Sequence, residues 1–258
     1  MAGNPGQANA WIRRFHPLPE ARVRLVCFPH AGGSASYYFP VSRALAEVAD
    51  VLVLQYPGRQ DRRAEPCIED TDELADAVTV ALRERLDLPT VLFGHSMGAT
   101  LAFEVARRLE RDGIAFSGLV VSGRRAPAQL GREQVHTASE SQLISHVKKL
   151  SGTDAGVLAD PDILRMILPA IRSDYKAAET YRYRPGRPLS CPLFVLTGDD
   201  DPQVTPTEAE QWRDYTTGDF ALEVFEGGHF YFSTAPDKPL AHLAECVAAL
   251  TPPVARAS

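Results

Sequence analysis

A serine lies between two glycines in the stretch VLFGHSMGAT, which is centred on Ser96. The stretch follows an apolar run and precedes an alanine-rich one, so we expect Ser96 at a sharp turn from a strand into a helix, with its hydroxyl held above the sheet. Gly94 and Gly98 suit this turn because a Cβ would collide where the strand and the helix pass closely. A helix that begins at Met97 directs free N–H groups at the same place. The pattern predicts a nucleophilic serine, and the alternative is a turn residue with small neighbours.

A serine hydroxyl is a weak nucleophile until a base takes its proton, so the hypothesis requires a histidine on another loop. His229, in FEGGHFYF, follows the last apolar run in a glycine-rich loop and is the predicted base. His95 adjoins the serine and points elsewhere at such a turn. His30 is less favoured as the base, because its side chain is needed to shape the turn after an earlier strand. The other four histidines lie in a tail or on helical patterns: His16, His136, His146 and His242.

An acidic side chain must orient the base, and LTGDDDPQVTP supplies three aspartates after the preceding apolar run. Asp201 is the predicted residue because it lies farthest past the strand, before Pro202. Asp199 and Asp200 suit hydrogen bonds within the turn. The order serine, aspartate, histidine along the chain is the order of α/β-hydrolases and differs from those of chymotrypsin and subtilisin.

A second donor for a substrate oxyanion is expected in CFPHAGGSASYY, where a strand ends and the chain turns through two glycines. The backbone N–H of Ala31 is the predicted donor, together with the N–H of Met97. Losing one such donor typically lowers turnover ~10²–10³-fold. The alternative is a glycine turn without a catalytic role.

Elements that place these residues are visible as an alternation of short apolar runs and longer amphipathic segments. The apolar runs have the length of strands buried on both faces; they are 23–28, 51–55, 90–93, 118–122, 192–197 and 221–225. The helical patterns are about 36–47, 70–86, 97–111, 206–215 and 236–250. This alternation predicts an α/β fold, a mostly parallel sheet with helices on both faces and ligands at the carboxyl ends of the strands.

About 70 residues without a convincing strand interrupt the alternation after 118–122. A structureless loop of that length is rare in a compact domain. Apolar residues at helical spacing predict instead a helical lid over about 136–182, inserted at the carboxyl edge of the sheet; they are Leu143, Ile144, Val147, Ile163, Leu164, Ile167 and Leu168. The alternative is that these are ordinary core helices. We expect residues 1–258 to form a single domain that contains this lid.

Composition excludes several other classes of protein. The formal net charge of −6 argues against nonspecific binding to nucleic acid or to an anionic membrane. No secretory signal and no apolar run of transmembrane length is present. The four cysteines lie far apart without a C-x-x-C pair, which predicts neither a zinc site nor a disulfide framework; they are Cys27, Cys67, Cys191 and Cys246. We therefore expect reduced thiols and a cytoplasmic location. We also expect a monomer, which none of these patterns addresses.

Taken together, the chain resembles the type II thioesterases, α/β-hydrolases that serve polyketide synthases and non-ribosomal peptide synthetases. The resemblance runs from RLVCFPHAGGSASYY through LQYPGRQDRRAEP, LFGHSMGATLAFEVARRL and TGDDDPQV to FEGGHFYF. It implies that Ser96 is the nucleophile, Asp201 the orienting acid and His229 the base, with the Ala31 and Met97 amides as oxyanion hole. It also implies an acyl or peptidyl carrier protein with a phosphopantetheine thioester as partner, an acyl chain beneath the lid against apolar residues such as Met97, and no metal or diffusible cofactor.

Other readings remain open. A general carboxylesterase or lipase, or an acyltransferase, would carry the same triad, and a non-catalytic binding protein could retain the fold. The segment YPGRQDRR places Arg59, Arg62 and Arg63 after a strand, where they suit the pantetheine phosphate or an acidic carrier surface. The alternative is a solvated turn in which Arg59 is paired structurally.

Overall fold

Six apolar runs form the parallel strands of the computed structural model, which describes residues 10–129, 131, 134–150 and 160–251. The strands are β2 (Arg24–Phe28), β3 (Asp50–Leu54), β4 (Thr90–His95), β5 (Gly118–Ser122), β6 (Leu193–Gly198) and β7 (Phe220–Phe225). They are hydrogen-bonded in the order β3-β2-β4-β5-β6-β7. Each coincides with a predicted run within two residues at either end. The predicted α/β fold class with a mostly parallel sheet is therefore confirmed.

A seventh strand, β1 (Ile12–Arg13), was not predicted from the sequence. It pairs antiparallel with β3, with Ile12 opposite Leu54, and completes the sheet at that edge. Two residues are too few to show a periodicity of hydrophobic side chains, so only the pairing itself identifies this strand.

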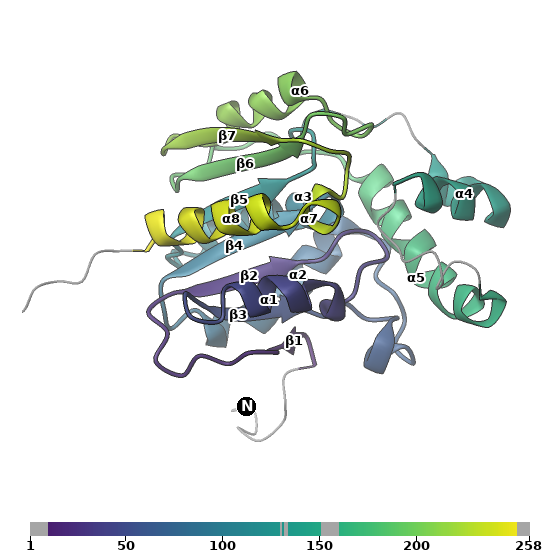
Figure 1. Cartoon of the computed structure of the whole chain (residues 1–258), viewed down its shortest axis with the longest axis horizontal. Helices are drawn as coiled ribbons and strands as arrows, with labels where there is room; N and C mark the ends of the chain where they lie inside the picture. Colours follow the sequence, from purple (N-terminus) through teal and green to yellow (C-terminus); the bar gives the residue numbers. More distant parts are fainter. Residues whose placement is uncertain (1–9, 130, 132–133, 151–159, 252–258) are drawn as a thin grey trace, which may run out of the picture.

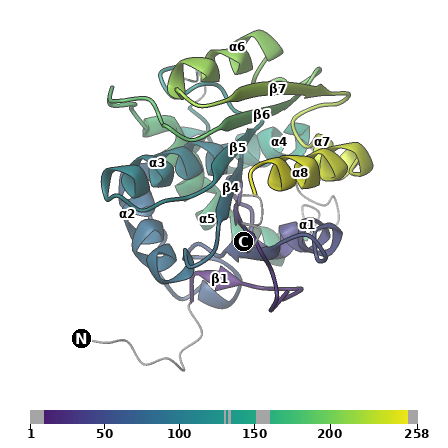
Figure 2. The ribbon, with the colours of Figure 1, turned by 90° about the vertical axis from the view of Figure 1, so that its left-hand side faces the viewer.

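Helices cover both faces of the sheet (Figure 2). On one face lie α2 (Thr71–Leu82) and α3 (Met97–Arg111), and α6 (Pro206–Glu210) extends this layer toward β7. On the other face lie α1 (Phe39–Ala44) and α8 (Asp237–Ala249). Strands β2 to β5 are buried along their whole length between these layers. The two apolar layers explain why those strands are continuous hydrophobic runs rather than alternating ones.

Several helix boundaries differ from the predicted ones. The predicted helix over 36–47 is a 3₁₀ turn, Ala35–Tyr38, followed by α1, and the second half of 206–215 is also 3₁₀, Gln211–Tyr215. Asp70 caps α2 by accepting hydrogen bonds from the N–H groups of Asp72 and Glu73, which satisfies two free amides of the first turn.

Two helices of the predicted insertion, α4 (Glu140–Leu150) and α5 (Pro161–Thr180), lie beyond the carboxyl ends of the strands (Figure 1). They pack through a small apolar cluster of their own, separate from the two layers on the sheet. Its buried members are Val135, Leu143, Val147, Leu168 and Ile171. The segment 151–159 of the predicted lid lies outside the described residues. The two helices are therefore placed over the edge where ligands bind in open α/β sheets.

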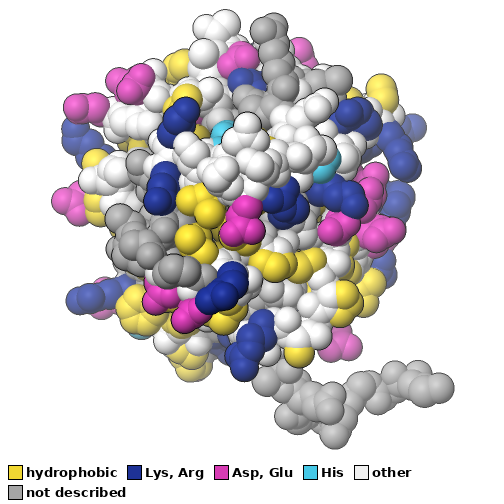
Figure 3. Space-filling model, turned by 90° about the vertical axis from the view of Figure 1, so that its right-hand side faces the viewer, with side chains coloured by type: hydrophobic (Ala, Val, Ile, Leu, Met, Phe, Trp, Pro, Cys, Tyr) yellow, Lys and Arg dark blue, Asp and Glu magenta, His cyan; other side chains and the backbone are white. Residues whose placement is uncertain are grey.

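The described residues contain no helix that is both long and apolar enough to span a bilayer. All four cysteines are free. Figure 3 views the face that carries α4 and α5, and there basic and acidic side chains are interspersed with hydrophobic ones. No large field of a single charge sign covers this face.

Candidate active site

Ser96 occupies a strained turn between β4 and α3. Its backbone has φ 55° and ψ −121°, a conformation that residues other than glycine rarely adopt. The Ser96 N–H donates a hydrogen bond to the carbonyl oxygen of Ser122 at the end of β5, 2.8 Å away. The turn expected from the sequence is present, and the neighbouring strand holds it in place.

Gly94 and Gly98 make this turn possible. A Cβ at Gly94 would lie 2.1 Å from the carbonyl oxygen of Gly98, and a Cβ at Gly98 would lie 2.0 Å from the carbonyl oxygen of Phe28. Both contacts are with backbone atoms, which cannot rotate away. The close approach that the sequence predicted is therefore real, and it also joins α3 to the end of β2.

His229 and Asp201 come together beside Ser96. The His229 Nε2 lies 3.0 Å from the Ser96 Oγ, and its Nδ1 lies 2.8 Å from Asp201 Oδ2. The side chains of His229 and Asp201 are 2% and 0% exposed. Asp201 Oδ1 also accepts a hydrogen bond from the N–H of Gln203 at 2.7 Å, which fixes the carboxylate. A hydroxyl, an imidazole and a carboxylate in this chain of bonds are arranged to move a proton from the serine.

Asp199 and Asp200 have other surroundings. Asp199 Oδ1 accepts a hydrogen bond from the N–H of Gly227 at 2.8 Å and so ties the end of β6 to the loop that carries His229. Asp200 has an exposed side chain, and its N–H donates to the carbonyl oxygen of Gly227. Both residues serve the loop, as their place in the aspartate run suggested.

Two further histidines adjoin His229 and are kept neutral. Burial, together with electrostatic interactions with His229 and Arg59, lowers the pKa of His30 to about 3. Burial also lowers the pKa of His95 well below its usual range, and the His95 Nδ1 lies 2.9 Å from the hydroxyl of Ser122. The His30 ring packs edge-on against Phe230, with centroids 4.8 Å apart. Within the described part of the chain, His229 alone of the three rings has a carboxylate as hydrogen-bond partner, and that partner is Asp201.

The proposed oxyanion donors line the same cavity as Ser96. Met97 is the first residue of α3, so its N–H has no partner within the helix. In the preceding loop the N–H of Gly32 donates to Asp174 at 2.7 Å, and the N–H of Gly33 donates to the carbonyl oxygen of His30 at 2.9 Å. Ala31 precedes these two bonded amides and lines the cavity with Ser96, and its N–H remains the predicted second donor.

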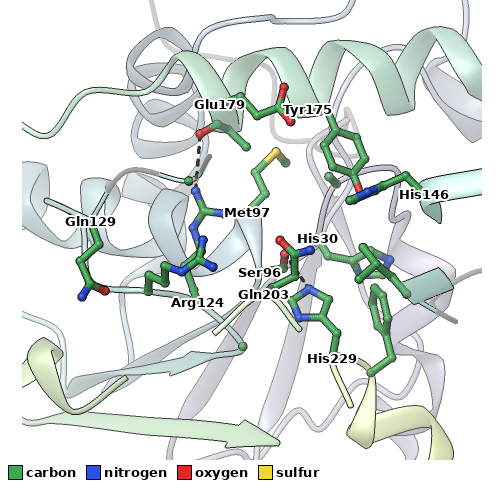
Figure 4. A pocket seen from close by; sticks show the side chains of 17 residues that line it. His30, Ser96, Met97, Arg124, Gln129, His146, Tyr175, Glu179, Gln203 and His229 are labelled. Carbon is green, nitrogen blue, oxygen red and sulfur yellow. Dashed lines mark hydrogen bonds between the residues drawn. The ribbon is translucent and has the colours of Figure 1, made fainter. Parts of the chain in front are cut away.

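Side chains from α4 and α5 line the cavity above Ser96 (Figure 4). His146 and Leu150 reach it from α4, and Tyr175, Ala178 and Glu179 reach it from α5. Further polar side chains in the lining are Arg124, Arg125, Gln129 and Gln203. The expected apolar wall is present only in part, at Met97, Leu150, Ala178 and Phe230.

Sequence reasoning did not single out these polar residues as part of the site. Gln203, two residues past Asp201, carried the only signal, because a residue so near a catalytic loop faces the same edge.

Of the two interpretations left open for the arginines, the structural one describes Arg59 and Arg62. Arg59 and Arg62 are buried and bonded within the protein rather than turned toward solvent or a phosphate. Arg59 makes a bidentate pair with Asp174, and Arg62 bonds Glu65 and the carbonyl oxygen of Gln55. The alternative, a solvated turn in which Arg59 is paired structurally, describes this segment: Arg59 is bonded to Asp174, and Gln60, Asp61 and Arg63 are exposed.

Among the described residues, no three metal-ligating side chains cluster in a way that could hold an ion.

Comparisons with known proteins identify the family. The model of the thioesterase domain family matches residues 23–250, which contain every residue of the site. A probable cadicidin biosynthesis thioesterase of Streptomyces griseus is 54% identical over 93% of this chain and 66% of its own length. Thioesterase PikA5 of Streptomyces venezuelae is 51% identical over 86% of this chain and 80% of its own length.

A solved structure agrees with these relatives. The type II thioesterase BorB from the borrelidin biosynthetic cluster superposes with a TM-score of 0.86 at 53% identity, covering 93% of this chain and 99% of that chain. The chain therefore belongs to the thioesterase family and is a thioester hydrolase of the α/β-hydrolase fold.

Proposed function

We propose that this protein is a type II, editing thioesterase, which hydrolyses acyl thioesters from the phosphopantetheine arm of acyl or peptidyl carrier proteins in polyketide or non-ribosomal peptide biosynthesis. The observation that carries the proposal is the chain of hydrogen bonds from Ser96 through His229 to Asp201 in a member of the thioesterase family. The relatives named for such pathways support the substrate class.

Acylation begins when Ser96 Oγ attacks the thioester carbonyl carbon while His229 Nε2 takes the hydroxyl proton. Asp201 holds the imidazole in the tautomer that accepts at Nε2 and stabilises the imidazolium that forms. The backbone amides of Ala31 and Met97 bind the negative oxygen of the tetrahedral intermediate. The carbon–sulfur bond then breaks, the pantetheine thiolate takes the proton from His229, and the acyl group remains on Ser96 as an ester.

Deacylation repeats these steps with water. His229 takes a proton from a water molecule as the water attacks the acyl ester, and the same amides bind the second oxyanion. The Ser96–acyl bond breaks, Ser96 recovers its proton from His229, and the free acid leaves. Every proton is transferred through His229, and no cofactor takes part in either half of the reaction.

Residues 136–182 act in this proposal as a lid over the acyl group. Support comes from the side chains that α4 and α5 send into the cavity, among them His146 and Tyr175, and from the separate apolar cluster that joins the two helices. Because this cluster is distinct from the layers on the sheet, α4 can be displaced for substrate entry without opening the main core, while α5 stays bonded to the Gly32 turn.

The test compares three substrates that contain the same acyl group: an intact acyl-carrier protein, free acyl-pantetheine and the p-nitrophenyl ester. The proposal predicts the highest kcat/KM for the carrier-bound thioester. A higher kcat/KM for the free ester would favour the carboxylesterase, which is the rival enzyme of the same fold. Ser96→Ala serves as the blank for background hydrolysis in all three assays.

A further inference from the structure

A single carboxylate joins α5 to the turn that carries the proposed oxyanion donor. Asp174, in the middle of α5, is 1% exposed. Its Oδ2 accepts hydrogen bonds from the N–H of Gly32 at 2.7 Å and from Arg59 Nη1 at 2.6 Å, and its Oδ1 accepts one from Arg59 Nη2 at 2.8 Å. Gly32 follows Ala31 directly, so this carboxylate holds the peptide next to the donor.

Arg59 holds the other side of the same turn. Its Nη1 also donates to the carbonyl oxygen of Gly33 at 3.0 Å, and its guanidinium lies over the ring of Tyr56, 5.2 Å from the centroid. A planar guanidinium can bond the carboxylate with both Nη atoms and still reach a carbonyl, which a lysine cannot do. The turn is thus bonded through the N–H of Gly32 and the C=O of Gly33.

Packing between α5 and the turn leaves little freedom. Gly32 has φ +76°, and a Cβ there would lie 2.6 Å from Cγ1 of Ile171, which is buried in the apolar cluster of α5. Glycine is needed both for the left-handed backbone and for this contact. The peptide of Ala31 and Gly32 is therefore held between the serine turn on one side and α5 on the other.

We propose that Asp174 and Arg59 are positioning residues for catalysis: their ion pair orients the Ala31–Gly32 turn so that the Ala31 N–H faces the oxyanion. This inference rests on the proposed function, because it takes Ala31 as a donor. In this proposal Arg59, the buried arginine of YPGR, contributes to the reaction by holding the backbone of the turn and does not bind a substrate phosphate. It also makes the geometry of the oxyanion hole depend on the position of α5.

The ion pair itself argues for positioning rather than for stability alone. Burying an arginine and an aspartate removes both from water, and apolar side chains of similar volume are often as stable in such places. What an apolar pair cannot do is accept from the Gly32 amide and donate to the Gly33 carbonyl. The double variant Arg59→Met/Asp174→Leu therefore separates the two roles, because it removes the polar contacts without leaving a buried charge unpaired.

Three variants and one matched control test the proposal. Asp174→Asn and Arg59→Lys weaken the pair, and the double variant replaces it. The control is Asp50→Asn: Asp50 is also a buried carboxylate, 2% exposed in its side chain, and it pairs with Arg14 and Arg24. Asp50 begins β3 at the amino edge of the sheet, far from the serine turn. It reports the effect of losing a buried ion pair without touching the site.

The readouts are kcat and KM for p-nitrophenyl acetate per titrated active site, the affinity for an alkyl boronic acid, and the melting temperature. A boronate on serine places an oxygen in the oxyanion position, so its affinity reports that geometry.

In the three variants of Asp174 and Arg59 we expect kcat to fall about tenfold to a hundredfold, as for an oxyanion donor that is displaced rather than deleted. Boronate affinity should fall by a similar factor, with KM within about twofold of wild type, since ester binding before attack does not require the oxyanion contact.

Asp50→Asn should lower the melting temperature and leave kcat per active site unchanged. Unchanged kcat and boronate affinity in the double variant would overturn the positioning role, as would an equal loss of kcat in Asp50→Asn. Because the free ester is the substrate, these results do not depend on the carrier protein. A failure of the proposed function would appear instead as a preference of the wild-type enzyme for the free ester over the carrier-bound thioester.

Discussion

The Nδ1 of His229 lies 2.8 Å from Oδ2 of Asp201, and neither side chain is more than 2% exposed. This contact fixes which nitrogen of His229 faces Ser96. An asparagine in place of Asp201 fills the same volume but presents an amide in some orientations, and it cannot stabilise the charged imidazole.

Asp201→Asn is expected to lower kcat by about 10³–10⁴-fold, as loss of the orienting carboxylate does in serine hydrolases. The matched change is Asp199→Asn, because Asp199 accepts one hydrogen bond from the Gly227 amide and an asparagine oxygen can replace it. Its kcat should stay within about tenfold of wild type. Steady-state hydrolysis of an acyl-carrier protein measures both, and an equal loss at the two positions would contradict the assignment.

Gly98→Ala is expected to damage both stability and activity. The added Cβ would meet the Phe28 carbonyl oxygen at 2.0 Å and the Pro29 carbonyl oxygen at 2.7 Å, and these residues lead into the proposed oxyanion loop. A clash with backbone should lower the free energy of unfolding by about 3 kcal/mol or more.

Gly113→Ala is the matched control for Gly98→Ala. Gly113 has φ +70° and no atom within 4 Å of an added Cβ, so only backbone strain of about 1 kcal/mol is expected there. Chemical unfolding and kcat of the two variants are compared side by side. Equal losses of stability, or full activity in Gly98→Ala, would show that the close approach at the serine turn is not required.

Stability should fall as the pH drops below the ordinary histidine range. The pKa of His30 is lowered to about 3 by burial, whereas a histidine in the unfolded chain titrates near 6.5. Between these values the unfolded state binds a proton that the folded state does not, so folding is favoured above pH 6.5 and weakens toward acid. The buried ring of His95 adds a loss of the same sign.

The free energy of unfolding should therefore decrease from pH 6.5 to pH 5, by up to about 1.4 kcal/mol per pH unit from His30 alone. His30→Gln removes this contribution and should flatten the slope over that interval. Urea unfolding at pH 7, 6 and 5 gives both slopes. Parallel curves for wild type and variant would mean that His30 is protonated as readily in the folded protein as in the unfolded chain.

Most of the fold follows from the pattern of the sequence. The strands β2 to β5 are buried on both faces, so their residues are apolar without interruption and predict their own positions. Ser96, Asp201 and His229 were found because each follows a predicted strand, β4, β6 or β7, and the carboxyl ends of parallel strands share one edge. The strand β1 was missed because two residues carry no periodicity.

The bonds that Asp174 and Arg59 make to the turn after β2 could not be predicted from the pattern of the sequence. Asp174 bonds Gly32 across 142 residues of sequence, and on a helix its residue type is typical of a solvent-facing position. Arg59 after a strand end suits a phosphate as well as it suits a buried partner. Whether Arg59 meets a phosphate or a buried carboxylate depends on where α5 lies, and tertiary packing rather than local sequence decides that position.

Mass spectrometry of the intact protein, mixed rapidly with an acylated carrier protein, shows whether Ser96 carries the acyl group during turnover. We predict a transient mass increase equal to the acyl group, located after digestion on the peptide that contains Ser96 and absent from Ser96→Ala, which should also lose turnover. An acyl adduct on another residue, or full turnover in Ser96→Ala, would contradict it.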